Sequence, residues 1–176
     1  MQVTIRKASA SDINAVSKIY EHIHNEQEKG TINTGWLRGV YPTRATAESA
    51  LLRDDLFVEE VNGKTVGTAI INKIQPEVYK KAAWQYELPN EEIMILHTLA
   101  IEPNAKGNGF GKAFVEYYEQ YAANYGCSCL RMDTNELNTY ARSFYKKLNY
   151  SEVGVFSCLF NGIPDVKLVM LEKTLD

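Results

Sequence analysis

Hydrophobic residues near the start of the chain recur at two spacings, one typical of strands and one typical of helices. Val3 and Ile5 alternate with polar neighbours, which is the period of a half-buried strand. Residues 13–23 carry apolar side chains every three or four positions, which predicts an amphipathic helix, and residues 45–53 predict a shorter one. The chain therefore begins with a strand that is followed by two helices.

A hairpin comes next. Residues 56–61 and 65–71 are typical of strands, and Asn62-Gly63 lies between them. Both central residues of a type I′ turn need positive φ, which Asn and Gly tolerate. This pair therefore predicts a tight antiparallel connection.

The longest apolar run, Ile93–Ile101, is interrupted only by His97 and Thr98. A strand with that pattern is buried on both faces, so we expect it at the centre of its sheet, ending before Pro103. The rest of the chain alternates helix and strand patterns, over residues 110–125, 130–133, 141–148, 150–157 and 166–172. This order predicts a mixed α/β sheet with helices on both faces, formed by a single domain over residues 1–176.

Composition narrows the class of protein. The 176 residues carry a net charge of −3, and 45% are hydrophobic and 23% charged, as in ordinary globular proteins. There is no excess of Lys and Arg, which argues against a nucleic-acid or membrane-surface protein, and no apolar run approaches the ~20 residues of a membrane span. The first residues lack the apolar core of a signal peptide, and the three cysteines form no disulfide framework. We expect a cytoplasmic enzyme or small-molecule binder without a metal.

A glycine-rich segment, Lys106–Lys112, lies between the central strand and the next helix. Its glycines let the backbone approach an anion closely, and the N–H groups at a helix start attract phosphate. The Walker spacing fails because only three residues separate Gly107 from Gly111 and because Ala113 follows the lysine. The dinucleotide spacing G-x-G-x-x-G fails as well. A phosphate or pyrophosphate is the expected ligand, and a turn without a ligand is the alternative.

Three motifs, in order along the chain, resemble the GNAT superfamily of N-acetyltransferases. His97–Pro103 is similar to the family's fourth strand, Lys106–Gly111 to its acetyl-CoA loop [RQ]-x-x-G-x-[GA], and Asn138–Tyr150 to its N-x-x-A-x-x-F-Y-x-K-L-G-F/Y helix. The similarity covers residues 3–173. Lys106 departs from the pattern, because the family usually has Arg or Gln there.

The resemblance implies a mostly antiparallel central sheet whose fourth and fifth strands splay apart, with acetyl-CoA as co-substrate. The pantetheine arm would lie in the gap, bonded by the backbone of Leu99 and Ile101 and by Asn138, while Ala141 leaves room for it. The pyrophosphate would lie on backbone N–H groups of the glycine-rich segment. The implied cofactor-binding residues are Leu99, Ala100, Ile101, Lys106, Gly107, Asn108, Gly109, Phe110, Gly111, Lys112, Asn138, Ala141 and Tyr145.

The chemistry needs two proton transfers. Acetyl transfer expels a thiolate, and the resemblance assigns its protonation to the phenol of Tyr145, which by spacing alone is a core aromatic. The amine must lose a proton, and His97 is a candidate base because imidazole titrates near neutrality. By period two, His97 shares a face of its strand with Leu99 and Ile101. A chain of waters as the base, with His97 lining the acceptor pocket, is the alternative.

Two irregular segments, residues 30–44 and 75–91, carry aromatic and basic side chains that are unusual in loops. In the family these regions cover the acceptor site. Pairing of Arg38 with a carboxylate would favour an acidic amino acid derivative or a peptide as the acceptor. The predicted acceptor-binding residues are Trp36, Arg38, Tyr41, Trp84, Tyr86 and His97.

These observations predict a cytoplasmic N-acetyltransferase that moves an acetyl group to a primary amine of a small molecule or peptide by direct transfer in a ternary complex. A CoA-binding sensor without chemistry is the alternative. The residues do not define the acceptor. They also leave the oligomeric state open, although homodimers are common in the family.

Overall fold

The strands of the protein form one sheet. They are β1 (Val3–Lys7), β2 (Leu56–Val61), β3 (Lys64–Asn72), β4 (Ile93–Ile101), β5 (Cys129–Asn135), β6 (Ser151–Phe160) and β7 (Ile163–Thr174). The computed structural model describes residues 2–175, and within them the order across the sheet is β1-β2-β3-β4-β5-β7-β6. Each neighbouring pair in that order is antiparallel except β4 and β5, which are parallel. The predicted mixed, mostly antiparallel sheet is confirmed.

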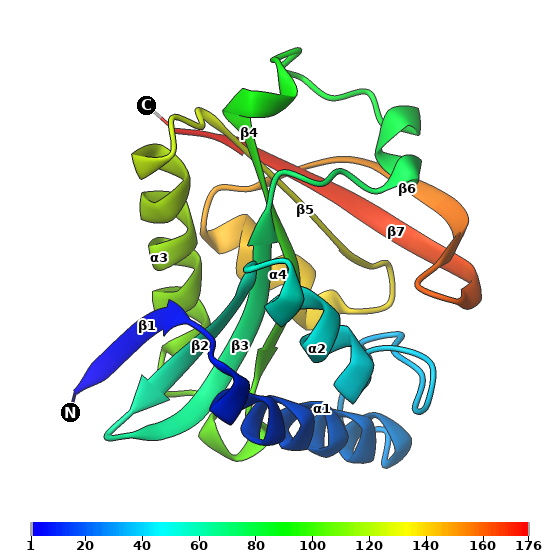
Figure 1. Ribbon diagram of the computed structural model, residues 1–176. Coiled ribbons are helices and arrows are strands. Elements are labelled where there is room, and N and C mark those ends of the chain that lie inside the picture. Colours follow the sequence, from blue (N-terminus) through cyan, green and yellow to red (C-terminus); the bar gives the residue numbers. More distant parts are fainter. Residues whose placement is uncertain (1, 176) are drawn as a thin grey trace.

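Helices cover both faces of this sheet, as predicted. They are α1 (Ile13–Glu28), α2 (Arg44–Leu52), α3 (Phe110–Asn124) and α4 (Thr139–Lys147). Tyr20 of α1 packs with Ile70 on one face, whereas Phe114 of α3 and Tyr145 of α4 pack together on the other. We call these the α1–α2 face and the α3–α4 face. Figure 1 shows α1 and α2 side by side, with α3 apart from them.

Two Asn-Gly turns join neighbouring strands. Asn62 and Gly63, with φ of 51° and 80°, connect β2 to β3 and confirm the predicted hairpin. Asn161 and Gly162, with φ of 52° and 78°, connect β6 to β7 in the same way. The two closing strands therefore reach further toward their shared turn than their hydrophobic patterns predict.

β4 and β5 pair along only part of their length. Residues 93–96 of β4 pair with residues 129–132 of β5, after which β4 stays paired with β3 and β5 with β7. A gap therefore opens beyond Leu96 and Met132, in the middle of the sheet. The splay that the family resemblance implies is confirmed. It also limits the predicted burial of β4 on both faces, because residues 97–99 border the gap and are only half-buried.

Candidate functional site

A cavity of about 690 Å³ opens where β4 and β5 separate. The ends of these two strands form its middle. α4 borders it on the α3–α4 face, and the loop before α2, α2 itself and the β6–β7 hairpin border it on the other. The lining residues that matter below are Gly35, Trp36, Tyr41, Asn72, His97, Thr98, Leu99, Asp133, Asn135, Asn138, Ala141 and Tyr145.

A bulge at Thr98 changes the direction in which residues of β4 face. Thr98 has a φ of 52°, and at this point two residues of β4 lie opposite one residue of β3. His97 pairs with Ile70 and shares its α1–α2 face, whereas Leu99 packs with the cluster of α3 and α4. The expectation that His97 and Leu99 share a face is wrong, because the bulge interrupts the two-residue period.

His97 is held by Asn72. The Oδ1 atom of Asn72 accepts the backbone N–H of Ile74 at 2.9 Å, and its Nδ2 donates to Asp55 Oδ2 at 2.9 Å. His97 Nε2 lies 2.9 Å from that same Oδ1 and is therefore the donor. Burial lowers the pKa of His97 to about 4, so the ring is neutral at physiological pH and a weak base. The expectation that this imidazole titrates near neutrality is wrong.

The loop between β4 and α3 presents a row of free N–H groups. Gly107 and Gly109 both have a φ of 82°, which glycine adopts without strain. In the described part of the chain, no backbone N–H from Gly107 to Lys112 donates a hydrogen bond to another backbone group, whereas the N–H of Ala113 bonds to the carbonyl of Gly109. A Cβ at Gly107 or Gly109 would meet no atom within 4 Å. The loop is thus an open anion nest at the start of α3.

The side chains of this loop leave the nest uncovered. Asn108 Nδ2 donates to the carbonyl of Ala105 at 3.0 Å, and Phe110 is buried. Lys112 Nζ pairs with Glu116 at 3.4 Å. Lys106 is exposed overall, and partial desolvation of its ammonium lowers its pKa. The backbone, rather than these side chains, is what the loop offers to an anion.

α4 and its N-cap place three of the predicted residues along the cavity: Asn138, Ala141 and Tyr145. Asn138 Oδ1 accepts the backbone N–H of Ala141 at 3.1 Å and so caps the helix. Its Nδ2 donates to no other group among residues 2–175, so this amide can still serve a ligand. Ala141 adds only a methyl group to the wall, which leaves space beside the gap.

Tyr145 is both a core residue and a cavity residue. Its side chain is 7% exposed, and its ring meets that of Tyr150 edge to face, with centroids 5.9 Å apart. Burial, and then the negative charge of Asp133, raise the pKa of Tyr145. The phenol is therefore protonated at neutral pH, as a proton donor must be.

Asp133 lines the same cavity, although it belongs to none of the sequence motifs described above. It is the first residue of β5 beyond the segment that pairs with β4. Tyr79 Oη donates a hydrogen bond to Asp133 Oδ2 at 2.8 Å. Burial raises the pKa of Asp133 to about 6, although this hydrogen bond acts in the opposite direction. The sequence signal is an acidic residue directly after Cys129–Met132, the half of β5 that is buried.

Trp36 and Tyr41 lie in the cavity wall, as predicted for these two loop residues. Their rings meet edge to face with centroids 6.4 Å apart, and the Tyr41 and Thr98 hydroxyls are hydrogen-bonded. Burial raises the pKa of Tyr41 to about 12. The same loop approaches β5 so closely at Gly35 that a Cβ there would overlap the Asn135 side chain.

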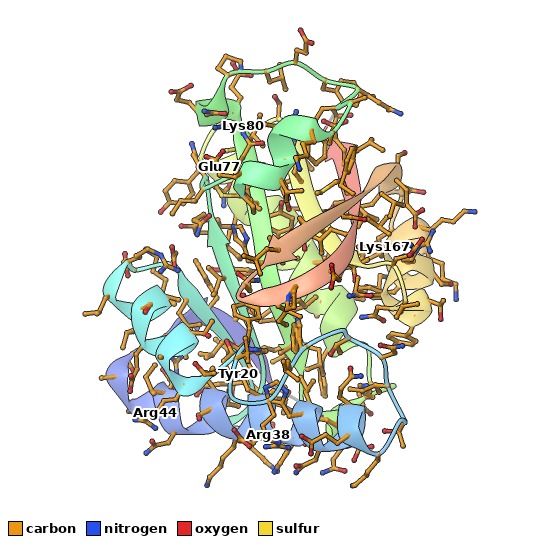
Figure 2. The ribbon with its side chains drawn as sticks, turned by 90° about the vertical axis from the view of Figure 1, so that its right-hand side faces the viewer. Tyr20, Arg38, Arg44, Glu77, Lys80 and Lys167 are labelled. Carbon is orange, nitrogen blue, oxygen red and sulfur yellow. The ribbon has the colours of Figure 1, made fainter. Side chains whose placement is uncertain are left out.

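Arg38, from the same loop, lies outside the cavity. Its guanidinium bonds to Glu28 at 2.7 Å, to Asn25 at 2.7 Å and also to Glu21. All three partners belong to α1, and Figure 2 shows Arg38 beside that helix. The expected pairing of Arg38 with an acceptor carboxylate is not supported, because carboxylates of α1 already surround this side chain.

Trp84 and Tyr86 also lie outside the cavity. The Arg131 guanidinium lies over the Trp84 ring, with its central carbon 4.1 Å from the ring centroid. The Tyr86 carbonyl accepts a hydrogen bond from Arg131 at 2.7 Å. Arg131 in turn pairs with the buried carboxylate of Glu172 at 3.2 Å. These contacts fasten residues 75–91 to β5 and β7, so this segment holds the edge of the site without forming its acceptor wall.

Two further features of the described residues bear on function. Among residues 2–175, no group of three or more His, Cys, Asp or Glu side chains is placed to hold a metal ion. No helix in that range is long and apolar enough to cross a membrane.

Relatives of this chain are N-acetyltransferases by name. An uncharacterized N-acetyltransferase of Bacillus subtilis is 25% identical over 150 residues, which are 85% of this chain and 91% of the relative. An uncharacterized N-acetyltransferase of Methanocaldococcus jannaschii is 28% identical over 99 residues, or 56% of this chain. That second match spans only 40% of the length of the relative.

Solved structures share the fold. A GNAT-family acetyltransferase from Streptococcus agalactiae has a TM-score of 0.82 at 20% identity, over 99% of this chain and 96% of that one. An acetyltransferase from Salmonella typhimurium, solved with its cofactor acetyl-CoA, has a TM-score of 0.68 at 18% identity, over 99% of this chain and 94% of that one. Residues 18–150 match the acetyltransferase (GNAT) family. The chain therefore belongs to the GNAT family, as a GNAT-type acetyltransferase.

Proposed function

We propose that this protein transfers the acetyl group of acetyl-CoA directly to a primary amine of a small molecule or peptide, with both substrates bound at once. The observation that carries the proposal is the gap between β4 and β5. It runs beside a row of free backbone N–H groups and opens into a cavity lined by Tyr145. A phosphate-bearing thioester and an amine can therefore approach each other from two sides of one opening.

The pyrophosphate and the pantetheine arm of the cofactor each have a separate place along this opening. The pyrophosphate lies on the nest from Gly107 to Lys112, which follows Lys106. Toward β5, the backbone of Leu99, Ala100 and Ile101 has no strand partner in the described residues, so it can bond the pantetheine arm as a sheet edge bonds a strand. Asn138 and Ala141 face the arm from α4.

The reaction then needs a proton at the leaving sulfur. Once the amine attacks the thioester carbonyl, the C–S bond breaks and the electron pair goes to sulfur. Tyr145 holds its proton at neutral pH because burial and the charge of Asp133 raise its pKa, so its hydroxyl is able to donate a proton to the thiolate. Trp36, Tyr41 and His97 line the part of the cavity left for the acceptor.

Calorimetric titration with acetyl-CoA tests the cofactor site. Gly109→Val is expected to abolish binding, because its side chain would occupy the space that the anion needs. Gly126→Val is the matched control: Gly126 has a φ of 72° and equally open surroundings, but it lies at the far end of α3. Unchanged affinity for acetyl-CoA in a folded Gly109→Val protein would contradict the site.

An assay of thiol release tests the reaction itself. The wild type is expected to release CoA thiol with at least one amine from a panel of amino acids, peptides, polyamines and aminoglycosides. Binding of acetyl-CoA without thiol release from any of them would instead favour the CoA-binding sensor. The panel also identifies the class of acceptor.

A further inference from the structure

We propose that Asp133 receives the ammonium group of the acceptor and takes a proton from it, and that Tyr79 positions this carboxylate. The inference deepens the proposed function and rests on it. It assigns the base of the reaction to β5, on the opposite side of the gap from the strand that carries His97.

The first argument is the place of Asp133 in the sheet. Met132 is the last residue of β5 to pair with β4, so the gap begins at Asp133. Side chains alternate along β5: Met132 packs in the cluster of α3 and α4, and Asp133 points the other way, toward Tyr79. Tyr145 approaches the cavity from the α3–α4 face. The proton donor and the carboxylate therefore approach the cavity from opposite faces of the sheet.

The second argument is that one oxygen of Asp133 is free. Oδ2 accepts the hydrogen bond from Tyr79, whereas Oδ1 accepts none from residues 2–175. Oδ1 is nevertheless not among the fully enclosed polar atoms that lack a partner, so it is open to the cavity. A carboxylate oxygen of this kind is a ready acceptor for an N–H group of an ammonium ion.

The third argument is charge. The negative charge of Asp133 raises the pKa of four neighbouring groups. They are Tyr41 from the loop before α2, Tyr79, Tyr145 from α4 and Cys158 from β6. None of these is a cation. Arg53 lines the same cavity but pairs with Asp55 at 2.9 Å, and no ion pair within 4.0 Å joins Asp133 to a Lys, Arg or His of the described residues. A negative group in such surroundings lacks a positive partner, which a bound ammonium would supply.

His97 is less suited to the role. Its Nε2 donates to Asn72, which leaves only Nδ1 to accept a proton, and burial lowers the pKa of the ring to about 4. Burial acts on Asp133 in the other direction and raises its pKa to about 6, which makes this carboxylate the stronger base and leaves it mostly ionised at neutral pH.

The protons of the reaction balance with these two residues. Asp133 takes one proton from the ammonium, the neutral amine attacks the thioester carbon, and the new C–N bond forms. The C–S bond breaks, Tyr145 protonates the sulfur, and the proton that leaves the new amide nitrogen restores Tyr145. The proton on Asp133 goes to solvent, so the products are the amide, the CoA thiol and one free proton.

Tyr79 is a positioning residue in this scheme. It lies in the short helix η2 (Glu77–Lys81), with its ring 5.2 Å from that of Trp84, and its carbonyl accepts the Trp84 indole N–H at 2.8 Å. Trp84 is in turn held over Arg131. The contacts that fasten residues 75–91 to the sheet thus also fix the hydroxyl that orients Asp133.

The test compares kcat/KM across pH for the acceptor amine that the panel identifies. Asp133→Asn is expected to lower kcat/KM on the order of 10²-fold and to remove the rise near pH 6, while acetyl-CoA affinity stays the same. Asp54→Asn, which removes an exposed carboxylate paired with Lys7, is the control and should keep the wild-type profile.

Tyr79→Phe tests whether Tyr79 positions Asp133. The measured quantity is the pH at which kcat/KM rises, which would not change if Tyr79 only stabilised the fold. The hydrogen bond from Tyr79 lowers the pKa of Asp133, so its loss should shift the rise in kcat/KM to higher pH. Tyr86→Phe removes a hydroxyl from the same segment outside the cavity and should leave the rise in place.

The outcomes separate the two proposals. If the wild type acetylates an amine and Asp133→Asn does so with the same kcat/KM and pH profile, this inference is overturned while the proposed function stands. If the wild type acetylates no amine of the panel, the proposed function fails and the inference falls with it.

Discussion

Tyr145 shows how one side chain can serve both the core and the site. Its ring fills the α3–α4 face of the sheet, next to Phe144 and Tyr150, and its residue also lines the cavity. The packing fixes the direction of the hydroxyl, so no entropy is lost in aligning it when substrates bind. A packing role for Tyr145 is therefore compatible with a role as proton donor.

Tyr145→Phe removes only the hydroxyl and keeps the packing. We expect kcat to fall on the order of 10²-fold, with acetyl-CoA affinity nearly unchanged, because only the protonation of the leaving thiolate is lost. An activated thioester whose leaving group needs no proton should restore the rate, and steady-state kinetics with both donors would measure this. Tyr125→Phe, on the exposed end of α3, is the control. Wild-type kcat in Tyr145→Phe, when chemistry limits the rate, would make the tyrosine a packing residue only.

Residues in contiguous motifs could be placed from the sequence, whereas residues that depend on distant partners could not. Asn138 and Tyr145 follow from the spacing of one helix, which folding preserves. The properties of Asp133 depend on Tyr79, more than 50 positions away in the chain. The prediction that Arg38 lies at the acceptor site is wrong for a similar reason. Its loop sequence does not show that Glu28 of α1 lies beside it in the fold.

At the scale of elements, the strands and helices were predictable and their irregularities were not. The Asn62-Gly63 turn has a direct sequence signal, and so has the Asn161-Gly162 turn, whose signal predicts the β6–β7 hairpin equally well. The bulge at Thr98 has none, because a β-branched residue rarely adopts positive φ. A single extra residue then reverses the face on which His97 lies.

The loop before α2 offers a matched pair of glycines for a test at this scale. Gly35 and Gly39 both have a φ of 74°, so alanine at either position suffers the same backbone strain, about 1 kcal/mol. Only at Gly35 would the new Cβ overlap a neighbour, the Asn135 side chain. Gly35→Ala should therefore push the loop with Trp36 and Tyr41 away from β5 and lower kcat/KM for the acceptor. Gly39→Ala, which has the strain without the overlap, should lower the melting temperature less and keep kcat/KM. Equal kinetics in the two variants would show that the close approach does not shape the acceptor wall.

The molecule as a whole contains charges whose contributions to stability change with pH in opposite directions. Hydrogen bonds from Arg6 lower the pKa of Asp12 to about 2, so this pair stabilises the fold above about pH 4 and less as the pH falls toward 2. Glu59 on β2 behaves in the opposite way. It is fully buried, neither of its oxygens has a hydrogen-bond partner in the described residues, and burial raises its pKa to about 7.

Glu59→Gln is expected to remove part of the pH dependence of the free energy of unfolding. In the unfolded chain the carboxyl ionises near pH 4.5, but in the folded protein it keeps its proton until about pH 7. The wild type therefore loses stability as the pH rises between these values, whereas the amide has no charge to bury. From pH 5 to pH 8, wild type relative to Glu59→Gln should lose roughly 2 kcal/mol, which urea titrations at the two pH values would measure. Glu48→Gln, which removes an exposed carboxylate paired with Arg44, should follow the wild type at both pH values. A constant difference between wild type and Glu59→Gln across this range would mean that the carboxylate is solvated in the folded protein, and that the tight contact between Glu59 and Gly67 opens to water.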